Sequence, residues 1–166
     1  QLYPKNDNGY QTNISEVAMV MQRPNDDVFI NGIHQDSGFF SEYASSNASM
    51  IVWIPMFDCF KKNGTLEIIP KSHLRGPLPH NKNEWEQRRN GSRNTKGLLY
   101  IKESDLSQDE IKNIKSIDCK KGEMIFMHYD LIHRSGMNAS DEMRITFISR
   151  YSNLFGKNYI QKYGIW

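Results

Sequence analysis

Short runs of β-forming residues, separated at close spacing by turn residues, restrict the fold of this chain more than any other feature. The strongest run is Met50–Phe57, and another fills Ile14–Arg23 before Pro24. Further runs of this kind follow at 28–30, 66–69, 116–119, 123–128 and 143–151. Many short strands joined by turns are typical of antiparallel sandwiches and barrels. We therefore expect an all-β core with only a few short helices.

Two segments interrupt the strand pattern. Ser107 followed by Glu110 three residues later matches a capping box, which predicts a brief helix over 109–115. Residues 71–96 contain helix-breaking prolines and glycines, and their basic side chains outnumber the acidic ones. At most a short helix near 85–89 is expected there. A long excursion of this kind is usually a lid or binding loop.

Composition excludes several classes of protein. At 166 residues the chain has room for one domain, spanning 1–166. Its 21 basic and 19 acidic residues leave a formal charge of +2, too small for a protein that coats nucleic acid. No apolar run is long enough to span a membrane. Cys59 and Cys119 are far apart and form no CxxC pair, so a reduced, cytoplasmic setting is the default expectation.

A metal site is suggested by His34 and Asp36. Side chains two residues apart on an extended segment point to the same face, so both can reach one ion. Alone, this pattern more often reflects a surface histidine and a turn aspartate than a metal site. His133, after an apolar strand, offers a third ligand. Two imidazoles and one carboxylate leave positions open on Fe(II) for a co-substrate and dioxygen. His73 and His128 are not expected to be ligands.

Arg144 lies eleven residues after His133, among apolar residues of the last strong strand. Burying a guanidinium without a partner is costly, and its planar fork fits a carboxylate with two hydrogen bonds. The alternative is an arginine on the exposed face of an alternating strand. Gln22 is polar on an otherwise apolar strand, and its side chain either points into the pocket that would hold this carboxylate or faces outward.

Taken together, these segments resemble the phytanoyl-CoA dioxygenase family of Fe(II)- and 2-oxoglutarate-dependent oxygenases. The resemblance runs in order over most of the chain and is carried by His34-Gln35-Asp36, Ile51–Pro55, Asn63–His73, Lys121-Gly122-Glu123, Leu131–Asn138 and Arg144. It implies a double-stranded β-helix, or cupin-like jelly roll. It also implies that His34, Asp36 and His133 bind iron, that Arg144 and Ser135 hold the distal carboxylate of 2-oxoglutarate, and that Trp53 lines the co-substrate pocket.

The resemblance implies hydroxylation of an aliphatic C–H bond in a small organic substrate, with dioxygen consumed and succinate and CO2 released. No catalytic residue is expected beyond the iron ligands. Asp36 favours a hydroxylase, since halogenating relatives lack the carboxylate ligand. We expect an anionic substrate if the basic residues of 71–96 line the entrance to the active site. Two alternatives remain open: a non-catalytic jelly-roll protein that binds a small molecule, and a zinc hydrolase with Glu42 or Asp58 as its base.

The chain departs from the family in length. Relatives carry additional helical sequence before the HxD segment, whereas 33 residues precede His34 here. Such helices buttress one sheet of the barrel. We therefore expect a chain truncated at its N-terminus, with apolar surface exposed on one sheet.

Overall fold

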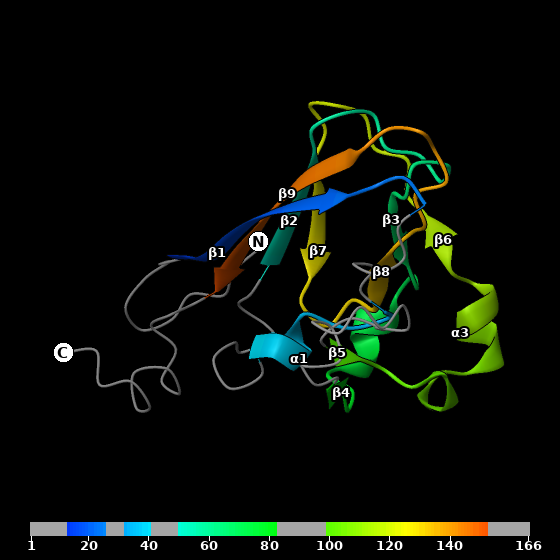
Figure 1. Cartoon of the computed structure of the whole chain (residues 1–166). Helices are drawn as coiled ribbons and strands as arrows, with labels where there is room; N and C mark the ends of the chain where they lie inside the picture. The colour runs from blue at the N-terminus through cyan, green and yellow to red at the C-terminus, as the bar shows by residue number, and fades with distance from the viewer. Residues whose placement is uncertain (1–12, 26–31, 41–49, 83–98, 153–166) are drawn as a thin grey trace.

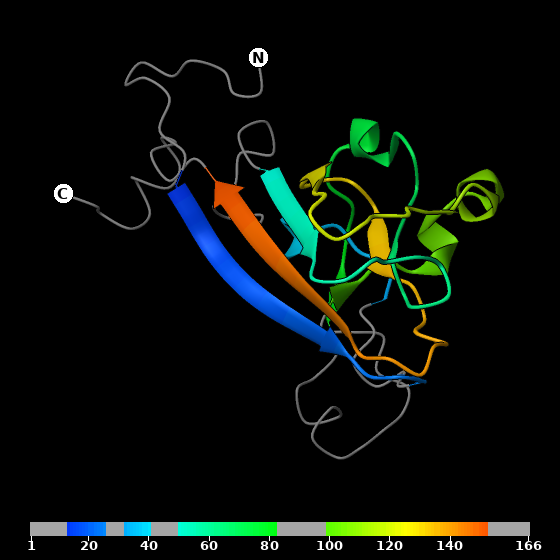
Figure 2. The ribbon, with the colours of Figure 1, turned by 90° about the horizontal axis from the view of Figure 1, so that it is seen from above.

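Two antiparallel sheets enclose the core of the molecule (Figure 1). The first has the strand order β1-β9-β2-β7, built from Asn13–Gln22, Arg144–Ser152, Met50–Pro55 and Ile125–His128 respectively. The structure, a computed structural model, describes residues 13–25, 32–40, 50–82 and 99–152. Figure 2 shows β1, β9 and β2 side by side as one curved layer, with the second sheet on its concave side.

The second sheet has the order β6-β3-β8, from Lys115–Ser116, Leu66–Ile68 and His133–Ser135. Two further short strands pair with each other, and the helices are all single turns or little more. These elements are β4 (Asn81–Lys82), β5 (Leu99–Tyr100), α1 (Ser37–Phe40), η2 (Ser72–Arg75), η3 (Glu103–Asp105) and α3 (Gln108–Lys112). The expected all-β jelly roll with few short helices is confirmed.

The main core lies between the two sheets. Ile51 and Trp53 of β2 pack with Leu66 of β3 and Met127 of β7, and all four are nearly inaccessible to solvent. Burying large apolar side chains stabilises the fold by about 1.5–3 kcal/mol each. Because these residues come from both sheets, their packing holds the sheets face to face.

Most expected elements are present with shifted ends. The Ser107 capping box is formed, because Ser107 Oγ accepts from the Glu110 amide and the Glu110 carboxylate accepts from the Ser107 amide. The helix ends at Lys112 and not at 115. The expected strand 116–119 is shorter, with β6 at Lys115–Ser116 and an isolated bridge at Cys119. The strand expected at 28–30 and the helix expected near 85–89 lie outside the described residues.

The outer face of the first sheet carries exposed apolar side chains. Val17, Met19 and Met21 alternate along β1 and are each at least half exposed, as is Phe126 on β7. Apolar surface on one sheet was expected from the sequence. No helix in the described part of the chain is long and apolar enough to cross a membrane.

Candidate active site

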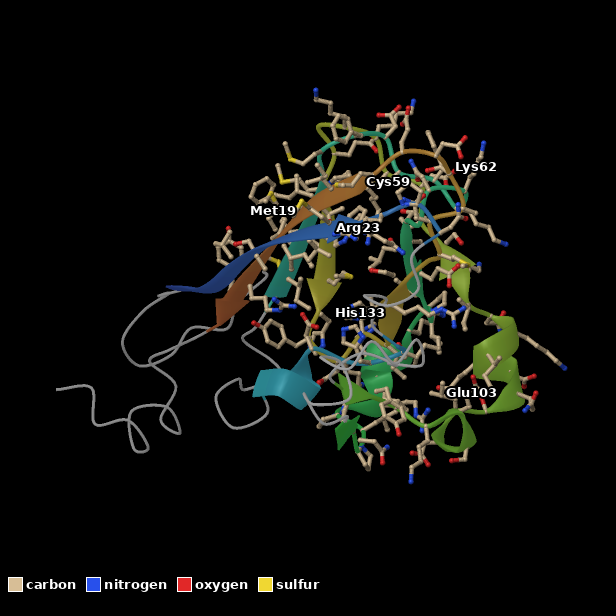
Figure 3. All side chains as sticks on the ribbon, in the orientation of Figure 1. Met19, Arg23, Cys59, Lys62, Glu103 and His133 are labelled. Atoms are coloured by element: carbon tan, nitrogen blue, oxygen red, sulfur yellow. The ribbon has the colours of Figure 1, made fainter. Side chains whose placement is uncertain are left out.

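The two histidines of the expected triad are direct neighbours across a backbone bridge. His34 donates its amide proton to the His133 carbonyl at 3.0 Å, and His133 donates to the His34 carbonyl at 2.9 Å. The ring centroids lie 4.4 Å apart. Both residues are buried, and Figure 3 shows His133 between the two sheets. The backbone pairing therefore fixes the spacing of the two imidazoles.

Asp36 completes the cluster. Its Oδ1 lies 3.3 Å from His34 Nε2 and 3.8 Å from His133 Nε2, and has no hydrogen-bond partner among the described residues. Gln35, between the two ligating positions, points elsewhere: it bonds Gly76, Leu78 and Asp130. The alternation predicted for this segment therefore holds, and Gln35 anchors it to two neighbouring loops.

The hydrogen bonds of both imidazoles prepare them for a metal ion. Nδ1 of His34 contacts the Gly32 carbonyl at 2.7 Å, and Nδ1 of His133 contacts the Leu131 carbonyl at 2.8 Å. A carbonyl oxygen can only accept, so each Nδ1 carries a proton. The Nε2 atoms of both rings face Oδ1 of Asp36 and are the atoms that would bind a metal. One oxygen and two nitrogens lie within 4.8 Å of one another, a donor set that fits Fe(II).

Charge states in the metal-free site also suit a cation. Burial, and next the charge of His34, lower the pKa of His133 to about 4, so its ring is neutral at physiological pH. Burial by itself would raise the pKa of Asp36, but the neighbouring His34 imidazole, and next the charges of His133 and Arg150, hold it well below its usual range. A carboxylate and a neutral imidazole are the protonation states that bind metals.

Arg144 lies in the same pocket on the central strand β9 and is 3% exposed. Burial lowers the pKa of its guanidinium to about 10, so it stays charged at neutral pH. Within the described ranges no carboxylate pairs with it, and Nη1 has no hydrogen-bond partner. Arg144 is therefore buried, as expected, and the alternative of an arginine on an exposed face is excluded.

Three residues surround the Arg144 guanidinium. Ser135 Oγ accepts from Nη2 at 3.2 Å, and Gln22 Oε1 accepts from Nε at 2.9 Å. The Trp53 ring centroid lies 5.9 Å from the central guanidinium carbon. Trp53 and Ser135 line the pocket, whereas Gln22 is buried behind Arg144, with Nε2 donating to the Gly136 carbonyl. Gln22 thus orients the arginine and does not line the pocket itself.

Sequence reasoning missed two polar residues that line this pocket, Thr146 and Arg150. Both lie on β9 at even spacing from Arg144, so the strand alternation brings them to the same face. Thr146 is fully buried and its Oγ1 has no hydrogen-bond partner among the described residues. Arg150 Nε donates to Asp36 Oδ2 at 2.7 Å. The signal was available in the two-residue period of the strand.

Two of the other histidines lie away from the triad, whereas His80 is close to it, with its Nε2 accepting from the Gln35 amide at 2.9 Å. His73 and His128 pack against each other, with ring centroids 5.5 Å apart, and neither lines the pocket. In the described part of the chain, the only cluster able to hold a metal is His34, Asp36 and His133. Asp58, the described candidate for a hydrolytic base, is exposed and accepts from the Lys121 amide. Glu42 lies outside the described residues.

Comparison with protein families and curated proteins gives consistent matches. A family model described as phytanoyl-CoA dioxygenase matches residues 2–146. The chain is 27% identical over 139 residues to a probable phytanoyl-CoA dioxygenase of Caenorhabditis elegans, covering 82% of this chain and 41% of that protein. It is 33% identical over 115 residues to the peroxisomal phytanoyl-CoA dioxygenase of Bos taurus, covering 68% and 30%. The chain thus spans well under half the length of these relatives.

Solved structures share the fold at low identity. The non-heme monooxygenase ThoJ superimposes with a TM-score of 0.63 at 21% identity, covering 87% of this chain and 47% of that one. EvdO2 of Micromonospora carbonacea, complexed with 2-oxoglutarate, superimposes with a TM-score of 0.61 at 19% identity, covering 83% of this chain and 52% of that one. The epimerase SnoN with Fe3+ and alpha ketoglutarate superimposes with a TM-score of 0.59 at 18% identity, covering 86% of this chain and 50% of that one.

Proposed function

Because the chain belongs to the phytanoyl-CoA dioxygenase family of Fe(II)- and 2-oxoglutarate-dependent oxygenases, we propose that it hydroxylates an aliphatic C–H bond of a small organic substrate. Dioxygen and 2-oxoglutarate are consumed, and succinate and CO2 are released. One observation carries this proposal: a buried two-histidine, one-carboxylate cluster shares its pocket with a buried arginine whose Nη1 has no hydrogen-bond partner among the described residues.

His34, Asp36 and His133 would hold the iron through two Nε2 atoms and Oδ1. The hydrogen bonds from both Nδ1 atoms to backbone carbonyls keep the rings turned toward the centre. Oδ1 of Asp36 supports the assignment, because a buried carboxylate oxygen without a hydrogen bond destabilises the fold unless a cation lies beside it.

Arg144 would bind the distal carboxylate of 2-oxoglutarate. Its Nη1 is available for an anion, and the Ser135 hydroxyl lies beside its Nη2. The orphaned Thr146 hydroxyl adds a third donor on the same strand. Gln22 would fix the guanidinium from behind and Trp53 would form a wall of the pocket. The 2-oxoglutarate complex of the structurally similar EvdO2 supports the choice of co-substrate.

Iron with 2-oxoglutarate and dioxygen supplies the oxidising chemistry when bound. The contribution of the chain is to bind, orient and exclude water. Apolar side chains of Val20, Ile51, Leu66, Met127 and Ile148 complete the pocket wall. Such a wall limits water near a reactive centre and protects it from side reactions.

Hydroxylation is proposed over two other outcomes. Asp36 supplies a carboxylate at the position that halogenating relatives leave to a halide, and its Oδ1 faces both imidazoles. SnoN, an epimerase by its description, shares the fold, so the outcome depends on the substrate that the pocket presents. The zinc hydrolase alternative is weakened by the exposed position of Asp58, which does not line the pocket.

The proposal extends to an anionic substrate. It rests on the basic excursion at 71–96, of which the structure describes 71–82. There Arg75 is already paired with Glu110, at 2.8 Å from Nη1 to Oε1. We also propose that 1–166 forms one domain and that it acts in the cytoplasm, although the Bos taurus relative is named peroxisomal.

The proposal is tested by anaerobic titration of the chain with Fe(II) and then with 2-oxoglutarate, followed by the visible charge-transfer absorption of the chelate. We expect one iron per chain and a band that is lost in Asp36→Ala and in Arg144→Ala. His73→Ala is the matched control and should keep both the iron stoichiometry and the absorption band. Iron binding that survives His133→Ala but not His73→Ala would refute the ligand assignment. A chelate band without substrate-dependent succinate release would favour the non-catalytic binding protein.

A further inference from the structure

The two oxygens of the Asp36 carboxylate have different surroundings. Oδ1 faces His34 Nε2 at 3.3 Å and His133 Nε2 at 3.8 Å and has no hydrogen bond among the described residues. Oδ2 accepts a hydrogen bond from Arg150 Nε at 2.7 Å. The carboxylate is 1% exposed, so water does not compete for either oxygen. One oxygen is therefore directed at the histidines and the other is already occupied.

Arg150 reaches this carboxylate from β9, a central strand of the first sheet. Its backbone pairs with Ile51 of β2 on one side and with Glu16 of β1 on the other. Its side chain is 13% exposed and lines the pocket. A guanidinium held on a central strand can fix the rotation of a neighbouring carboxylate.

The arrangement has a direct consequence for metal binding. A carboxylate can bind a metal through one oxygen or through both, and the second mode would use up a further coordination position. With Oδ2 bonded to a cationic donor, an ion between the two imidazoles meets Oδ1 alone. Residues that orient ligands in this way commonly change metal affinity by 10–100-fold when they are removed.

We propose that Arg150 is a positioning residue of the metal centre, which holds Asp36 as a ligand through a single oxygen. This inference rests on the proposed iron site and adds a role for a residue outside the triad and outside the 2-oxoglutarate cradle. It separates the two pocket arginines of β9: Arg144 faces the co-substrate, and Arg150 serves the iron ligand.

Arg134 provides a matched control. Its Nε donates to Glu67 Oε2 at the same 2.7 Å, on strands β8 and β3, but the pair lies on a more exposed surface and lines no part of the pocket. Arg134→Ala removes an arginine–carboxylate pair of equal geometry without touching the metal ligands. It therefore measures what the loss of such a pair does in general.

Co(II), titrated anaerobically into the full chain, is the probe, because its visible spectrum reports coordination number independently of turnover. Arg150→Ala should weaken Co(II) binding by about 10–100-fold and alter the spectrum. Guanidinium chloride at a non-denaturing concentration should restore the wild-type spectrum in Arg150→Ala, because it can occupy the vacated place beside Oδ2. Arg134→Ala should match the wild type in both Co(II) affinity and visible spectrum. Circular dichroism identifies a folded variant, and Arg150→Lys, which keeps the charge, replaces Arg150→Ala if the latter does not fold.

Two outcomes would overturn the inference, and they are distinguishable. Wild-type affinity and spectrum in a folded Arg150→Ala would refute the role of Arg150 and leave the iron site intact. Absence of Co(II) binding by the wild-type chain would refute the proposed function, and the role of Arg150 with it.

Discussion

Gln22 on the edge strand β1 and Arg144 on the central strand β9 are directly paired in the sheet register, and their side chains are bonded as well: Arg144 Nε donates to Gln22 Oε1 at 2.9 Å. Gln22 in turn donates to the Gly136 carbonyl, so its amide cannot rotate freely. The neutral amide fixes the guanidinium without neutralising it. The charge of Arg144 thus remains available to an anion in the pocket.

Arg144→Ala should weaken 2-oxoglutarate binding by about 100-fold while Fe(II) affinity changes little. Truncating one partner of a buried charge pair costs roughly 2–5 kcal/mol, and the guanidinium does not contact the metal ligands. Isothermal titration of each ligand separately measures both effects. Equal loss of Fe(II) and 2-oxoglutarate binding would instead make Arg144 a residue needed for folding.

Gly64→Ala should disturb the Gln22–Arg144 pair. A Cβ at Gly64 would lie 2.7 Å from Gln22 Oε1 and 2.9 Å from the Gly136 carbonyl oxygen, so the amide must move. We expect 2-oxoglutarate affinity to fall together with the melting temperature.

Gly122→Ala is the control for backbone strain. Gly122 also has a positive φ, of 93° compared with 79° at Gly64, but a Cβ there meets nothing within 4 Å. It should cost about 1 kcal/mol in the free energy of unfolding and leave 2-oxoglutarate binding unchanged. Equal 2-oxoglutarate affinity in the two variants would exclude steric coupling through Gln22.

Thr146→Val should separate binding from stability. The valine keeps the shape of the side chain but removes a buried hydroxyl that has no partner in the described structure, so the free energy of unfolding should stay equal or rise. If the hydroxyl contacts 2-oxoglutarate, affinity should fall by about tenfold. Urea denaturation and calorimetric titration give the two values.

Thr65→Val is the comparison. Thr65 is equally buried, but its Oγ1 donates to the Ile117 carbonyl at 2.6 Å. Its replacement should lower the free energy of unfolding by about 1–3 kcal/mol, because the carbonyl loses its donor. Destabilisation of the same size in both variants would argue against an unused hydroxyl at Thr146.

His133 should make the metal-free chain less stable as the solution becomes acidic. Its pKa in the folded state is about 4, below the ordinary value of 6.5. The unfolded chain therefore binds a proton first, and stability is lost as the pH falls from 6.5 to about 4, by at most about 3 kcal/mol. Urea denaturation across this range with a chelator present should show the slope, and His133→Gln should reduce it. An unchanged slope in that variant would assign it to other groups.

The triad and Arg144 could be predicted because short segments of the sequence carry their signals. These signals are the spacing of the metal-ligating residue types and the free-energy cost of burying an arginine without an anion. His34 and Asp36 share a face of one extended segment, and an arginine among apolar strand residues needs an anion. The two-residue period places Arg150 on the same face as Arg144, but it does not reveal the partner of Arg150, since Asp36 lies 114 residues away and only the pairing of β9 between β1 and β2 brings them together.

The strand β8 was missed for a related reason. Its three residues are too few to show a period, and all three, His133, Arg134 and Ser135, are polar. It forms because β3 pairs with it, aligning Ile68 with His133 and Leu66 with Ser135. The role of Gln22 also depends on a cross-strand partner, which explains why the sequence left two placements for it.

The position of β9 has a consequence for how the protein matures in the cell. This strand is made after all the other described strands, yet it inserts between β1, the first, and β2. A growing chain that has not released residues 133–150 from the ribosome lacks one imidazole, both pocket arginines and the strand that joins β1 to β2. The first sheet and the site are therefore completed together, when the last described strand takes its place between β1 and β2.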